Sequence, residues 1–382
     1  MKIANEIQLP FYARVTIYLT GLIAFFAILY IAKDIIVPLL FAILFAILLH
    51  PVVNFLERLK IKRVAAIFIT LIIAFSLVTL LFAFLINQAS MFSDTWPQLV
   101  DKFTQTLNQI VSGASGYLNI DAQKIHAWIT NSISELINIS NAAIGKAIVT
   151  LGTGVMLTLL IPLYIFLMLY YQPLIIEFIR RLFSDSDQSQ VNQIVKQTKT
   201  VIQSYLVGLS IEAAIVAVLN ITFLLTLGIE YAVLIGIIGA LLNVIPYIGG
   251  IVAVALPMII ALATKSSAWY PLYVMAGYYV IQLIDNNYIV PYIVASKVKI
   301  NALFSIIIVF VGNALWGVAG MFLSIPLLAI VKLLFDNFES LKPWGYLLGD
   351  TMPSRKHVIP FFLKRNQEDV REVSGRKPDQ NS

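Results

Sequence analysis

The 382-residue sequence contains no cysteine and little charge, and both shortages exclude classes of protein. Without cysteine there are no disulfides, no thiolate metal sites and no cysteine nucleophile. Only 12% of the residues are charged, whereas 59% are hydrophobic and the mean hydropathy is +0.88. Such a chain has too few polar side chains to cover a soluble globule. We therefore predict a polytopic membrane protein.

Motifs for enzymatic or ATP-driven chemistry are also missing from the sequence. The three histidines lie in different regions, and there is neither a His-Glu-x-x-His motif nor a Gly-x-x-x-x-Gly-Lys-Ser/Thr phosphate loop. An intramembrane aspartyl protease needs two facing aspartates, and only Asp285 is well placed in an apolar segment. We therefore expect no enzymatic activity, no catalytic residue, no cofactor and no metal site.

Six apolar segments are predicted to cross the membrane as helices. Residues 15–32 are interpreted as a retained first helix and not as a signal peptide, because they lack a cleavage site and another apolar run follows closely. The six segments are residues 15–32, 35–49, 64–86, 148–170, 206–227 and 269 to about 294.

Two further uncharged stretches, residues 231–263 and 302–331, fit neither one span nor two. One spanning helix needs about 20 residues, and two helices with a turn need over ~40. Both stretches carry Asn, Gly and Pro at their centres. We predict re-entrant helical hairpins, whose tips must lie inside protein or line a wet cavity. Broken helices of this kind mark transport sites.

The charge distribution predicts the orientation of the chain. A net charge of +6 would suit nucleic acid, but the basic residues lie mainly in short loops and the tail, which favours a role in membrane orientation. Basic residues in 58–63 and 172–205 place both segments, and both termini, in the cytoplasm. The two hairpins then enter from opposite sides, as in an inverted repeat. The alternative is that Gly and Pro are simply common in membrane helices.

These features suggest an all-α architecture with five parts. Residues 87–147 should form an extracytoplasmic helical insertion, because apolar residues recur there at helical spacing. This insertion is either a structural cap, which we favour, or a lid or oligomer contact. The parts are a three-span scaffold (1–86), the insertion (87–147), a fourth span with a cytoplasmic helix (148–205), a carrier region with both hairpins (206–334) and a partly disordered cytoplasmic tail (335–382).

Glu212 and Asp285 are the acidic residues that lie well within apolar spans, one in each predicted repeat. A carboxylate there is costly without a polar partner or a water-filled cavity. We predict that one or both bind a proton or a cation and couple its movement to a conformational change. The alternatives are that Glu212 reaches the headgroups and that Asp285 begins an interfacial turn.

Amide side chains and hairpin backbones supply the candidate solute contacts. Carboxylate and amide oxygens suit sodium, lithium or polar solutes, although a lone amide is often only a contact between helices. Glycine and proline at a hairpin tip free backbone groups for a ligand. We expect the solute to bind between the two tips. The candidates are Gln282, Asn286 and Asn287 near Asp285, Asn243, Pro246, Gly249 and Gly250 at the first hairpin, and Asn313, Gly317 and Gly320 at the second; Asn220 adds another amide.

Several motifs taken together resemble the bacterial permeases of the autoinducer-2 exporter (AI-2E) family. Their order and spacing cover most of the chain. Gly250 stands where many relatives carry proline, and Asp285 lies in a region where many carry glutamate. The motifs are Pro38-Leu-Leu-Phe-Ala-Ile-Leu, Pro51-Val-Val-Asn-Phe-Leu-Glu, Ile245-Pro-Tyr-Ile-Gly-Gly, Asn286-Asn-Tyr-Ile-Val-Pro291 and Gly317-Val-Ala-Gly-Met-Phe-Leu-Ser-Ile-Pro326.

The resemblance implies a multi-pass permease of the bacterial inner membrane that forms homo-oligomers. Some members of the family are linked to export of the quorum-sensing signal autoinducer-2, and others to exchange of sodium or lithium for protons. We expect ion-coupled export of a small polar solute such as autoinducer-2. The alternatives are a Na⁺(Li⁺)/H⁺ antiporter, and a membrane scaffold or receptor that acts through residues 87–147. The expected partners are the lipid bilayer and a small polar solute or Na⁺ and H⁺, without nucleic acid.

Overall fold

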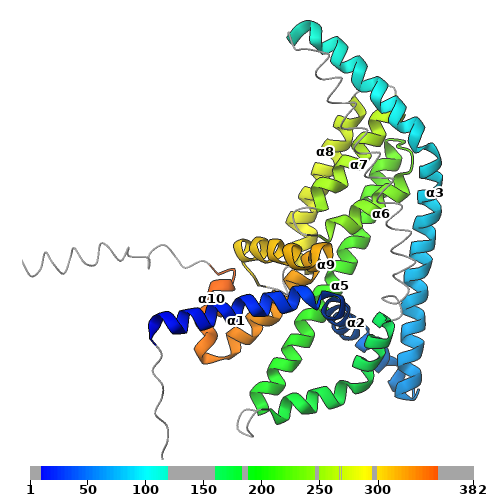
Figure 1. Cartoon of the computed structure of the whole chain (residues 1–382). Coiled ribbons are helices and arrows are strands. Elements are labelled where there is room, and N and C mark those ends of the chain that lie inside the picture. Colours follow the sequence, from blue (N-terminus) through cyan, green and yellow to red (C-terminus); the bar gives the residue numbers. More distant parts are fainter. Residues whose placement is uncertain are drawn as a thin grey trace, which may run out of the picture.

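The computed structural model describes residues 10–118, 160–182, 188–245, 249–265, 267, 269–294 and 299–351. Within these ranges the chain forms helices joined by turns, and no strand occurs there (Figure 1). The prediction of an all-helical membrane protein is confirmed. The elements are α1 (Phe11–Ile31), α2 (Lys33–Arg58), α3 (Arg63–Leu118), the helix Leu160–Arg181, α5 (Gln188–Thr226), α6 (Ala232–Asn243), α7 (Gly249–Thr264), α8 (Trp269–Ile284), the π-helix η2 (Asp285–Val294), α9 (Ala302–Asn337), the 3-10 helix η4 (Glu339–Leu341) and α10 (Lys342–Leu348).

Six of the described helices are long and apolar enough to cross a membrane. Five overlap the predicted spans: α1, α2, the Arg63–Ser90 part of α3, the helix Leu160–Arg181 and α5. The predicted sixth span, residues 269–294, is helical throughout and consists of α8 followed directly by η2. The sixth helix of sufficient length is α9, whose backbone is not helical at Gly317.

The third span continues into the predicted insertion as one helix. α3 runs without interruption from Arg63 to Leu118, past the predicted boundary at residue 87. In Figure 1 it forms the long helix along one side of the molecule. Residues 119–159, which hold the rest of the insertion and the start of the fourth span, lie outside the described residues, as does the tail from residue 352.

The N-terminal spans pack through small side chains. Ala42 and Ala46 of α2 meet Ala66 and Ile67 of α3 and Ile165 of the helix Leu160–Arg181 in one buried cluster. Small residues allow membrane helices to approach closely. The Arg63 guanidinium also donates a hydrogen bond to the Leu169 carbonyl at 2.7 Å, which fixes the start of α3 to the fourth span.

The first predicted hairpin is formed by α6 and α7, which pack against each other and against α5 and α8 respectively. A side chain on Gly249 would overlap the backbone carbonyl of Leu242, so the close approach of the two arms requires glycine at this position. Residues 246–248, including the candidate Pro246, lie outside the described residues.

The second predicted hairpin lies within α9. The chain reverses at Gly317, whose φ of 63° and ψ of −142° are not helical. Gly312 and Gly320 then face each other across the two arms, and the Ser324 hydroxyl lies 2.9 Å from the Ile308 carbonyl oxygen. Both segments thus fold as helical hairpins. Their entry into the bilayer, the inverted repeat and the five-part division stay predictions.

Candidate functional site

A buried carboxylate joins the first hairpin to the predicted sixth span. Asp285 begins η2 and is 2% exposed. The Asn243 side chain, at the end of α6, donates from Nδ2 to Asp285 Oδ2 at 2.8 Å. The Gln282 amide approaches the same oxygen at 3.4 Å. The structure therefore brings together three of the predicted site residues, from α6, α8 and η2.

A π-helical turn begins at the buried carboxylate. From Asp285 to Val294 the backbone is π-helical and contains Pro291, which cannot donate a backbone hydrogen bond. π-Helical turns are rare and frequently occur at functional sites. Asp285 itself lies on the face that α8 also buries, while the neighbouring Asn286 and Asn287 are exposed.

The backbone of α7 forms another wall of this site. A Cβ atom on Gly250 would lie 3.2 Å from Gln282 Oε1 and 3.8 Å from Asn243 Oδ1. Any side chain at residue 250 would therefore occupy the space between the two amides. Gly250 keeps the backbone of the first hairpin in contact with the polar groups.

Glu212 of α5 is the second buried carboxylate, at 4% exposed, and α5 packs against η2, which carries Asp285. Glu212 Oε2 and Asp285 Oδ1 are both buried without a hydrogen-bond partner among the described residues. No ion pair within the described part of the chain involves either residue. Buried charges of this kind are costly unless another group compensates them. The arrangement can accept a proton, a cation or a hydrogen-bond donor from a solute.

A second polar layer contains one residue that the sequence analysis missed. Asn220 and Tyr278 are buried on either side of Gly239, where a Cβ atom would lie 3.3 Å from Asn220 Nδ2 and 3.7 Å from the Tyr278 hydroxyl. Asn220 Oδ1 and the Tyr278 hydroxyl have no partner among the described residues. The spacing of seven residues between Tyr278 and Asp285, which places them on one helix face, was the available signal.

None of the remaining candidates among the described residues is hydrogen-bonded to the Asp285 carboxylate. Asn286 adjoins the site, because its Oδ1 accepts from the Gln282 amide at 3.4 Å. The Asn287 amide donates to the Leu283 carbonyl at 2.8 Å, and Asn313 is exposed. Gly317 lines a different cavity of about 480 Å³ together with Lys33 and Asp34. Gly320 packs against the other arm of α9.

The expected meeting of the two hairpin tips is not observed in the described residues. There, α9 packs against α1, α2 and α5 and has no contact with α6 or α7. The Trp316 indole donates to the Leu29 carbonyl at 3.0 Å, and this hydrogen bond holds the second tip against α1. The sequence pattern predicted where the helix is interrupted in both hairpins. Which segments each tip contacts depends on how the helices pack.

Known proteins match this chain over most of its length. Residues 19–340 match the family described as AI-2E family transporter. The AI-2 transport protein TqsA of Escherichia coli K12 is 25% identical over 84% of this chain and 90% of the relative. The putative transport protein YhhT of the same organism is 22% identical over 90% of this chain and 96% of the relative.

A third relative, the putative permease PerM of Escherichia coli K12, is 27% identical over 81% of this chain and 89% of its own length. The family is one of transporters and permeases and not of enzymes. The family match and the apolar helices together describe a multi-pass membrane protein. The chain belongs to the AI-2E transporter family.

Proposed function

We propose that this chain is a permease of the bacterial inner membrane that exports a small polar solute such as autoinducer-2, coupled to the movement of an ion. The observation that carries the proposal is the buried carboxylate of Asp285. It accepts a hydrogen bond from Asn243 and keeps a second oxygen without a partner among the described residues. The name of TqsA, an AI-2 transport protein, suggests the solute.

In this proposal the solute binds between the first hairpin and η2. A hydroxyl group of the solute donates to Asp285 Oδ1, while the amides of Asn243 and Gln282 hold the other oxygen. Carboxylate oxygens accept hydrogen bonds and amides both donate and accept, so the site suits a solute with several hydroxyl groups. Gly249 and Gly250 contribute the backbone that closes the site.

Glu212 is the proposed coupling residue. Two buried carboxylates on helices that pack together repel each other when both are ionised, and no ion pair among the described residues compensates them. A proton or a cation held by one of them lowers this cost. Exchange of that ion between the two sides of the membrane would then favour different conformations of the site.

Several earlier candidates are left out of the proposed site. Asn286, Asn287 and Asn313 have exposed side chains. Gly317 and Gly320 are assigned to the folding of α9. Pro246 lies outside the described residues and stays a prediction.

The two alternative functions have less support. A sodium–proton antiporter without an organic solute draws no support from the relatives described above. A receptor or scaffold would act through residues 87–147, and residues 119–147 lie outside the described part of the chain. Membership of a transporter family favours transport over both.

The test is efflux of autoinducer-2 from liposomes that contain the purified full-length chain, with and without an imposed proton or sodium gradient. We expect the gradient to accelerate efflux, and Asp285→Asn to slow it by about tenfold or more, as expected for loss of a hydrogen bond to a charged group. Glu230→Gln is the matched control. Glu230 is an exposed acid in the turn after α5, so the same change of charge should leave efflux unaltered.

Equal efflux from Asp285→Asn and Glu230→Gln would remove Asp285 from the site. If neither gradient changes the rate of efflux, the chain is still a permease, but the proposed ion coupling is overturned. Absence of autoinducer-2 efflux in tight, loaded liposomes would overturn the assignment of this solute.

A further inference from the structure

A second, mainly apolar cavity lies between the scaffold spans and the carrier region, and it shares no residue with the Asp285 site. Its volume is about 680 Å³, within the range of small-molecule sites. Its walls come from α2, the helix Leu160–Arg181, the first turns of α5 and the end of α9. Most lining side chains are aliphatic, for example Ile43, Ile176 and Ile194. The cavity can hold a hydrocarbon chain.

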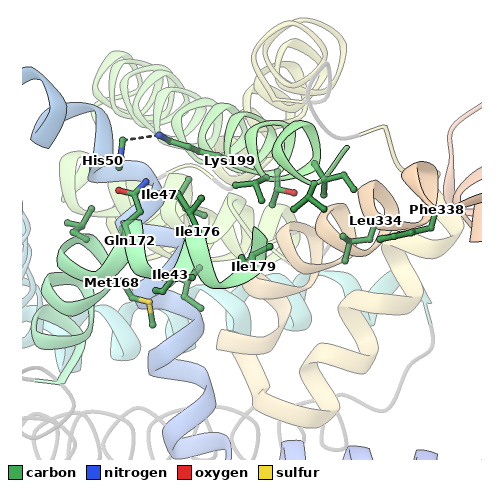
Figure 2. Close-up of a pocket in the computed structure, with 17 residues that line it drawn as sticks. Ile43, Ile47, His50, Met168, Gln172, Ile176, Ile179, Lys199, Leu334 and Phe338 are labelled. Atoms are coloured by element: carbon green, nitrogen blue, oxygen red, sulfur yellow. Dashed lines mark hydrogen bonds between the residues drawn. The ribbon is translucent and has the colours of Figure 1, made fainter. Parts of the chain in front are cut away.

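One side of this cavity is polar and basic. Lys199 of α5 lies 2.9 Å from His50 Nδ1 of α2. Because an ammonium group can only donate, His50 Nδ1 is the acceptor for Lys199, and the Asn54 amide nitrogen lies 3.0 Å from the same ring atom. Figure 2 shows Lys199 and His50 joined by a dashed line, with Leu334 and Phe338 on the opposite side of the view.

The positive charge at this end has no carboxylate partner among the described residues. The described residues that line the cavity include no Asp or Glu, and the described ion pairs do not involve Lys199. Glu57, seven residues after His50 on α2, lies 3.9 Å from Arg63. Arg63 in turn lies 3.4 Å from the Gln172 side chain, which lines the cavity. The polar end therefore favours an anion.

We infer that this cavity binds an anionic phospholipid of the surrounding bilayer, with one acyl chain between the aliphatic walls and the headgroup phosphate on Lys199. The cavity lies at one end of helices that are long and apolar enough to span the membrane, so a lipid of the leaflet at that end reaches it. Basic residues at this end belong to segments that the charge distribution places in the cytoplasm, where basic pockets between spans bind anionic headgroups.

A lipid in this position contacts both the scaffold and the carrier region. α2 and the helix Leu160–Arg181 lie on one side of the cavity, and α5, which carries Glu212, lies on the other. The occupant fills space that would otherwise separate the fourth span from the start of α5. The lipid thus braces α5 against the scaffold. This inference does not rest on the proposed solute or on ion coupling.

Native mass spectrometry of the purified full-length chain with phosphatidylglycerol or phosphatidylcholine tests the inference. For the natural sequence we expect one retained phospholipid per chain and a preference for phosphatidylglycerol of about tenfold. Lys199→Gln should reduce this preference to less than about threefold while the lipid still binds. Lys196→Gln is the control, because Lys196 is exposed on the same helix and does not line the cavity.

A second pair of variants tests the acyl chain. Ile176→Trp fills the cavity and should abolish retention of both lipids, whereas Leu174→Trp, at an exposed position on the same helix, should retain them. If Ile176→Trp fails to fold, the lysine pair still decides the matter. Equal lipid preference in Lys199→Gln and Lys196→Gln would overturn the inference, as would full retention in a folded Ile176→Trp. A retained mass of a free fatty acid in place of a phospholipid would also overturn it.

Discussion

Two helical hairpins, α6 with α7 and the one within α9, have different surroundings. In both, the helix is interrupted next to small residues. The first packs against α5 and α8 and brings Asn243 to Asp285. The second packs against α1, α2 and α5, and its polar contacts are internal or with α1, as the Ser324 and Trp316 hydrogen bonds show.

This difference separates two uses of a broken helix. In the first hairpin the break places an amide against a buried carboxylate that keeps an oxygen without a partner among the described residues. In the second the described polar groups near the break are satisfied within the protein or are exposed. Similar sequence patterns thus need not mark equivalent halves of one site. We expect substitutions of polar side chains at the first hairpin to slow transport, and those at the second to leave transport close to normal.

The largest expected effect is from Gly249→Ala. The new Cβ atom would overlap the Leu242 carbonyl, so the arms of the first hairpin must separate. Overpacking against backbone, which cannot rotate away, should cost roughly 3 kcal/mol or more. Thermal unfolding of the purified protein measures this loss. An unchanged unfolding temperature would show that the arms of α6 and α7 are not held this closely.

Gly317→Ala should destabilise the protein less, by about 2 kcal/mol. A Cβ atom at residue 317 meets nothing within 4 Å, so the cost comes only from the backbone angles, which favour glycine. The same thermal unfolding assay applies, and efflux from the folded fraction should be close to that of the natural sequence. A strong loss of efflux with normal stability would show that the second tip is part of the transport site.

Asn243→Ala and Asn313→Ala form a matched pair, one asparagine from each hairpin. Loss of the 2.8 Å hydrogen bond to Asp285 should slow autoinducer-2 efflux by about tenfold. Asn313 is exposed and outside the proposed site, so its replacement should change efflux by less than about twofold. Equal losses in the two variants would contradict the comparison and support a site between the tips.

The sequence predicted the features that depend on local chemistry. Both hairpins were identified as long uncharged stretches with glycines at their centres. Gly317 and Gly249 permit backbone geometry and close contacts that other residues do not. Burial of Glu212 and Asp285 followed from their apolar neighbours.

Features that depend on packing between distant segments could not be predicted in this way. The contact between Asn243 and Asp285 depends on which helix lies beside α6, and the separation of the tips depends on the contacts of α9. The π-helix that divides the predicted sixth span has no signature in an apolar pattern. Tyr278 was missed because its lack of a described partner is visible only in three dimensions.

The smallest expected effect on stability is from Tyr278→Phe, beside the first hairpin. Removal of a hydroxyl that has no described partner should change the free energy of unfolding by less than about 0.5 kcal/mol, because no hydrogen bond with those residues is lost. Ser324→Ala in the second hairpin is the contrast. Its hydroxyl lies 2.6 Å from the Gly320 carbonyl oxygen and 2.9 Å from that of Ile308, so its loss should cost about 1 kcal/mol.

Transport should show the opposite order for these two hydroxyls. A buried polar group without a hydrogen-bond partner lowers the stability of the fold. A solute or water that binds next to Asn220 and Tyr278 would supply the missing partner. Tyr278→Phe should therefore slow efflux about threefold without a change in stability. Ser324→Ala should not slow efflux by the folded fraction of the protein. If Tyr278→Phe transports normally, the solute path does not include this layer and the site is confined to Asp285 and its amides.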